Sequence, residues 1–114
     1  MKHSTIKIDV QLDDKSHPES IAWQASDAEV QGEQAAKAMM LAFWDGDKKS
    51  ALHIDLWTRE MMVDEMADFY YQMLMGMADS FKRATQQQEI SDDMKKFAKV
   101  FFEKFRATQI KEQK

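Results

Sequence analysis

The sequence predicts an α+β fold: a four-stranded antiparallel β-meander followed by a two-helix hairpin packed on one sheet face (ββββαα). Apolar and polar residues alternate in Thr5–Asp13 and again in Ala51–Thr58, as in strands with one buried face. Beyond Thr58 the apolar residues recur every three or four positions, as on one side of a helix: Met62, Met66, Phe69, Tyr70, Met73, Leu74, Met77 and Phe81. The change of period marks where the sheet ends and the helices begin.

The first two predicted strands flank a turn. Thr5–Asp13 alternates cleanly, with Ile6, Ile8, Val10 and Leu12 on its apolar side. Residues 13–19 are rich in turn formers and include the only proline, Pro18, so the chain is expected to reverse there. The next strand, Ser20–Ala25, would bury Ile21 and Trp23.

The third and fourth strands are predicted to form a hairpin. Ala35–Trp44 is apolar at nearly every position except Lys37, which suits either a helix or a strand. We favour a strand, because a glycine-containing turn over residues 45–50 leads directly into the alternating segment Ala51–Thr58. Apolar residues on both faces of the third strand indicate that it is covered on both sides.

Two helices are predicted after the strands. The first spans about Val63 to Gln88, with acidic residues near its start and basic residues near its end, as the helix dipole favours. Ser91 is expected to cap the second helix, whose apolar stripe is Met94, Phe97, Ala98, Phe101 and Phe105. We expect a single domain over residues 1–107 and a frayed polar tail over residues 108–114.

Composition excludes several classes of protein. The chain of 114 residues has no cysteine, so it has no disulfides and no thiolate metal site, and a reducing, cytoplasmic location is expected. No secretion signal and no apolar run of about 20 residues is found, which argues against export and a membrane span. The net charge of −4 argues against a protein that binds nucleic acid, whose phosphates require a basic surface. Basic residues predominate in residues 91–114, which is either a site for an acidic partner or a solvated helix face.

Few residues suggest catalysis or metal binding. His53 and Asp55 share one strand face, but two groups are too few for a closed metal site, and the polar side of a strand is the simpler interpretation. Asp64 and Asp68 have the spacing of carboxylate ligands without histidine partners on the helices. Three glycines cannot form a serine nucleophile elbow or a phosphate loop. We expect no enzyme, no cofactor and no metal.

The apolar content points instead to contacts with other molecules. Ten methionines and twelve aromatic residues exceed what one sheet face and two helices require. The second face of the third strand, either Met39-Leu41-Phe43 or Met40-Ala42-Trp44, is either core or an interface. As candidate interface, for a protein partner or for a homo-oligomer, we select Met39, Leu41, Phe43 and Trp57. The alternative is a cavity between helices and sheet, lined by methionine and aromatic residues, that binds a lipid or cofactor.

Several short blocks resemble a known family. Ile54-Asp55-Leu56-Trp57-Thr58, then Val63-Asp64-Glu65-Met66, then Arg83-Ala84-Thr85 make a distinctive combination. With the other blocks, which lie in order within about residues 5–105, they resemble gliding motility protein GldC of the Bacteroidetes. Those blocks are Ile6-Lys7-Ile8, Leu12-Asp13, Pro18, Ile21-Ala22-Trp23, Ala36–Leu41, Trp44-Asp45 and Met77-Ala78-Asp79. The chain departs from the family pattern at Met62, where a proline usually opens the helix, and at residues 27–29, which replace a glycine-containing turn.

The resemblance implies a small cytoplasmic accessory protein that supports surface gliding, a motility linked in those bacteria to type IX secretion. It implies a protein partner in the gliding machinery. It implies no enzymatic activity and supplies no catalytic or cofactor-binding residues.

Overall fold

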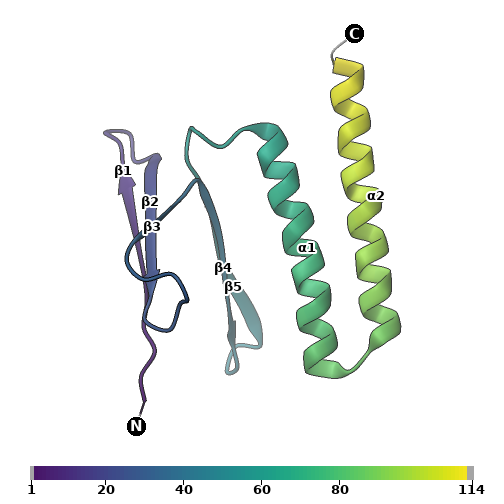
Figure 1. The fold of residues 1–114 in the computed structure, drawn as a ribbon, viewed down its shortest axis with the longest axis horizontal. Helices are drawn as coiled ribbons and strands as arrows, with labels where there is room; N and C mark the ends of the chain where they lie inside the picture. Colours follow the sequence, from purple (N-terminus) through teal and green to yellow (C-terminus); the bar gives the residue numbers. More distant parts are fainter. Residues whose placement is uncertain (1, 113–114) are drawn as a thin grey trace. The chain divides into compact units, whose positions relative to one another are not determined.

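The computed structural model describes residues 2–112, which form five strands and two helices (Figure 1). The strands make one compact unit that ends at Met61, and the helices make a second that begins at Met62. The α+β class and the antiparallel strand pairing predicted from the sequence are confirmed. The elements are β1 (Ile6–Leu12), β2 (Pro18–Ala25), β3 (Gln34–Ala36), β4 (Ala38–Asp45), β5 (Ser50–Trp57), α1 (Val63–Thr85) and α2 (Gln88–Glu112).

The first sheet is antiparallel, with β2 between β1 and β3. Ile8 lies opposite Trp23 and Val10 opposite Ile21, so the apolar residues of the two strands share one face, as their alternation predicts. Ile21 is almost fully buried at 2% exposure. A register shift between Gln11 and Leu12 ends the regular pairing next to the turn.

The predicted four-strand meander is wrong at its third strand, which bends at Lys37 and divides into β3 and β4. β3 pairs with β2 in a three-stranded sheet, whereas β4 pairs with β5 in a separate two-stranded sheet. Continued pairing with β2 would bring Pro18, which has no N–H to donate, opposite Met39. The Lys37 carbonyl instead accepts hydrogen bonds from Thr58, through its backbone N–H at 2.8 Å and its hydroxyl at 3.0 Å. Pairing therefore changes from β2 to β5 at this residue.

The helices form an antiparallel hairpin (Figure 1). At the start of α1 the backbone N–H of Met62 donates to the Glu65 carboxylate at 3.2 Å, so the helix begins with a side-chain contact to its first turn. Gln86 adopts a left-handed conformation with φ of 62°, which ends α1 before the predicted Gln88.

Small residues line the contact between α1 and α2. Ala78 and Ala98 are fully buried, and the Asp79 carboxylate binds the Lys95 ammonium at 2.7 Å. Ser91 does not cap α2 as predicted, because α2 begins earlier, at Gln88. The Ser91 hydroxyl is buried and donates to the Ala78 carbonyl at 2.8 Å, so it joins the two helices.

Three predictions about organisation have a partial outcome or none. α2 continues beyond Ala107 to Glu112, into the segment predicted as a polar tail. Lys114, the end of that tail, lies outside the described residues. A single domain over residues 1–107 and the packing of the helical hairpin on a sheet face both stay predictions.

The close helix contact gives a test of stability. Ala98→Leu introduces a branched side chain at a fully buried position and is expected to destabilise the protein by about 1–3 kcal/mol through overpacking. Ala107→Leu, at an exposed position of the same helix, is the control and should stay within about 0.5 kcal/mol of the wild type. Urea unfolding followed by circular dichroism measures both, and equal effects would contradict the packing described for Ala98.

Candidate interaction surface

The candidate surface is built on the hairpin of β4 and β5. Both strands are rich in aromatic and branched side chains, and the turn over residues 46–49 joins them without changing their register. The Asp45 carboxylate accepts hydrogen bonds from the backbone N–H groups of Asp47 and Lys48, at 3.0 and 3.1 Å, which fixes the turn. Every pair from Asp45 with Ser50 to Ala38 with Trp57 follows without a bulge.

One face of this hairpin is apolar at every pair except the one next to the turn, Asp45 with Ser50. Met39 lies opposite Leu56, Leu41 opposite Ile54 and Phe43 opposite Leu52, and opposed residues share a face. We call these six residues the aliphatic face: Met39, Leu41, Phe43, Leu52, Ile54 and Leu56. Three of them remain open to solvent, Phe43 at 57% exposure, Leu52 at 62% and Ile54 at 42%. A hydrophobic face of this extent is typical of a surface that contacts other groups.

The opposite face carries the two exposed tryptophans. Trp44 is paired with Ala51, and Trp57 is paired with Ala38. Between them His53 and Asp55 make this face partly polar, with His53 Nδ1 2.9 Å from Asp55 Oδ2. We call this the aromatic face. Within residues 2–112 no group of three or more histidine and acidic side chains is placed to hold a metal ion.

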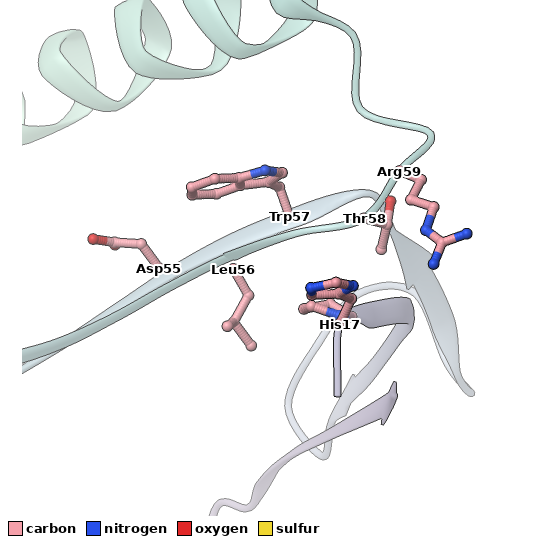
Figure 2. Close-up of a pocket in the computed structure, with 7 residues that line it drawn as sticks. His17, Asp55, Leu56, Trp57, Thr58 and Arg59 are labelled. Atoms are coloured by element: carbon pink, nitrogen blue, oxygen red, sulfur yellow. The ribbon is translucent and has the colours of Figure 1, made fainter. Parts of the chain in front are cut away.

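The register divides the four predicted interface residues. Met39, Leu41 and Phe43 lie together on the aliphatic face, whereas Trp57 lies on the aromatic face. Figure 2 shows Trp57 and Leu56 on opposite sides of β5. The interface predicted from the sequence does not include Leu52, Ile54 and Leu56. The alternation in β5 and the length of the hairpin turn are signals that place these residues opposite Met39, Leu41 and Phe43. Whether this surface binds a partner stays a prediction.

A shallow pocket of 390 Å³ lies beside the end of β5 (Figure 2). Its lining is mainly apolar and includes His17, Pro18, Leu56 and Trp57. It contains no methionine, so it is not the methionine-lined cavity of the ligand-binding alternative, which stays a prediction.

A charged contact fixes one side of this pocket. Arg59 donates to the Asp13 carboxylate, which joins the turn after β1 to the segment after β5. The backbone N–H groups of His17 and Lys15 also donate to Asp13, each at 2.9 Å. These contacts hold the pKa of Asp13 below its ordinary value: the His17 N–H has the largest effect, followed by the Lys15 N–H and the positive charge of Arg59. A pair 46 positions apart leaves no local sequence signal, which is why it was not predicted.

The fold and this surface define a small α+β protein whose most prominent feature is a β-hairpin with exposed apolar side chains on both faces. Its family follows from comparison with known proteins. The family model described as gliding motility-associated protein GldC-like matches residues 18–107, so the chain belongs to this family and the resemblance is confirmed. The match begins with β2 and ends inside α2. Searches of curated proteins and of solved structures gave no match. No helix in residues 2–112 is long and apolar enough to cross a membrane.

The Asp13 contact predicts a pH-dependent stability. Because its pKa is lowered in the folded state, the ionised carboxylate stabilises the fold above about pH 3.8, and this contribution disappears as pH falls through the lowered value. Asp13→Asn should therefore lower the Tm at pH 7, and the difference from the wild type should shrink below pH 3.8. Melting curves recorded at a series of pH values from about 2.5 to 7 measure how this difference in Tm depends on pH. Asp14→Asn, at the exposed neighbouring position, is the control. A difference that does not change with pH would contradict the role of the charge.

Proposed function

We propose that this chain is a non-enzymatic interaction protein that supports bacterial gliding motility, in association with type IX secretion in the Bacteroidetes. Membership of the GldC-like family supports the link to gliding. The absence of cysteine from the chain is compatible with action in the cytoplasm, where thiols stay reduced. The partner is a protein of the gliding machinery.

The aliphatic face of the β4–β5 hairpin is the observation that carries the proposed interaction. Complete burial of a large apolar side chain contributes roughly 1.5–3 kcal/mol. Phe43, Leu52 and Ile54 are each about half exposed, so covering them contributes on the order of 3 kcal/mol. A partner that supplies a complementary apolar surface would gain this energy.

The two carboxylates whose pKa is lowered, Asp13 and Asp79, are bound to basic side chains from other segments of the fold, which supports a role in binding rather than catalysis. Asp13 with Arg59 joins two segments of the strand unit, and Asp79 with Lys95 joins the two helices. The Lys95 contact, first through its hydrogen bond and then through its charge, lowers the pKa of Asp79. In both pairs the basic partner keeps the carboxylate ionised. A group that exchanges protons near neutral pH needs a pKa shifted in the other direction.

The proposed function is tested in the native organism. Deletion of the gene should reduce colony spreading, and the wild-type gene should restore it. Phe43→Ser removes an exposed apolar side chain from the aliphatic face and is expected to restore spreading poorly while its Tm stays close to that of the wild type. Val30→Ser, at an equally exposed position in the loop before β3, is the matched control and should restore spreading fully.

Two results would count against the proposal. Normal spreading after deletion would remove the role in motility. Equal restoration by the Phe43→Ser and Val30→Ser variants would remove the aliphatic face as the surface that matters.

A further inference from the structure

The outer edge of β5 is an unpaired strand edge in a two-stranded sheet. Within residues 2–112 β5 pairs only with β4. A two-stranded hairpin has marginal stability by itself, and an exposed edge is a template for another strand. β5 has no bulge and no proline, the features that usually protect an edge.

The hydrogen-bond pattern shows which residues of β5 face outward. The Thr58 N–H donates to the Lys37 carbonyl, one position beyond the last pair of the β4–β5 ladder. In an antiparallel ladder, residues whose N–H and C=O point to the partner alternate with residues whose groups point away. Counting back from Thr58, the outward residues of β5 are Ala51, His53, Asp55 and Trp57.

These outward residues are complementary to themselves in an antiparallel arrangement. If two β5 strands are paired about Ile54, then His53 of each lies opposite Asp55 of the other. In the same register, Leu52 lies opposite Leu56, and the small Ala51 lies opposite the large Trp57. Shifting the centre to His53 or to Asp55 places like groups opposite each other, histidine on histidine or carboxylate on carboxylate. Ile54 is therefore the centre that pairs each imidazole with a carboxylate.

We propose that two copies of this chain associate through the outer edge of β5, antiparallel, about a two-fold axis at Ile54. The same edge is used by both copies, as a two-fold interface requires. The two hairpins then form one continuous four-stranded sheet, with the two aliphatic faces joined on one side. This inference concerns self-association and is independent of the proposed role in gliding.

β1 is another edge strand with complementary charged residues, with Lys7 opposite Asp9 when two copies pair about Ile8. That edge differs from β5 in two ways. The pairing of β1 is interrupted by a register shift at Gln11 and Leu12, and its second face is polar, so its sheet has no second apolar surface to cover. β5 belongs to the hairpin that has exposed apolar side chains on both faces. The structure therefore favours β5.

Cross-linking tests the register directly, because the chain has no cysteine of its own. In the proposed dimer, the two Ile54 side chains lie opposite each other across the axis, at a position without hydrogen bonds, where Cβ atoms approach to about 4.5 Å. The variant Ile54→Cys should form a disulfide-linked dimer on mild oxidation. The variant Leu52→Cys is the matched control on the same face, because its two thiols are separated by four residues, about 13 Å along the strands, and should stay unlinked.

Charge exchange tests the recognition without cysteine. Edge pairing buries less surface than a standard interface, which buries roughly 800 Å² per partner. We therefore expect a weak wild-type dimer, with a Kd on the order of tens of micromolar. His53→Asp should weaken it at least about tenfold, because carboxylates then face each other at both ends of the axis. The double variant His53→Asp with Asp55→Lys replaces this repulsion by pairs of aspartate with lysine and should recover wild-type affinity within about threefold. Sedimentation equilibrium at low salt measures these constants, and circular dichroism confirms that each variant is folded.

The proposal is overturned by any of three results. One is a wild-type protein that stays monomeric at several hundred micromolar. Another is equal cross-linking of the Ile54→Cys and Leu52→Cys variants. The third is a dimer that cross-links through Ile8→Cys and not through Ile54→Cys, which would place the interface on β1.

Discussion

The strand unit depends on the interaction between Lys37 and Thr58. The Lys37 carbonyl accepts both the backbone N–H and the hydroxyl of Thr58, and Thr58 is buried at 3% exposure. An amide or hydroxyl left unpaired at such a position would cost about 1–3 kcal/mol, so the contact fixes where the chain turns from one sheet to the other. β3 and β4 are parts of one continuous segment, and this contact decides that its second part pairs with β5.

That division determines the properties of the hairpin. A strand in the middle of a larger sheet has both edges paired, and only its faces remain to be covered. Because β4 does not continue the pairing of β3 with β2, it forms a ladder with β5 alone, and no strand within residues 2–112 pairs with the outer edge of β5. The register without a bulge then sorts the side chains into the aliphatic and aromatic faces. The faces and the edge therefore need different contacts. Apolar groups can cover a face, whereas another strand can pair with the backbone N–H and C=O groups of an edge.

Local patterns in the sequence predicted most of the elements but not their long-range pairing. The alternation in β1 and β5 and the spacing of apolar residues in α1 placed these elements within a few residues of their observed limits. Ser91 was misplaced because serine is common at helix starts, and only the neighbouring helix shows that its hydroxyl binds the Ala78 carbonyl. The bend at Lys37 depends on Thr58, 21 positions later, and therefore on a contact that periodicity does not encode. Trp57 was grouped with Met39 for the same reason, because a strand face is defined by register.

His53 and Asp55, the residues of β5 considered for a metal or catalytic site, are interpreted differently once the register of the hairpin is known. His53 and Asp55 lie within hydrogen-bond distance on the aromatic face, and their backbone groups point out from the open edge. An imidazole and a carboxylate two positions apart on an edge strand can pair reciprocally with those of a second copy in the antiparallel direction, whereas a parallel copy in register places like groups opposite each other. Polar pairs of this kind contribute little affinity, but they select one register among those that apolar side chains alone would allow. In this protein the polar pair in β5 is therefore better suited to specifying a partner strand than to performing chemistry.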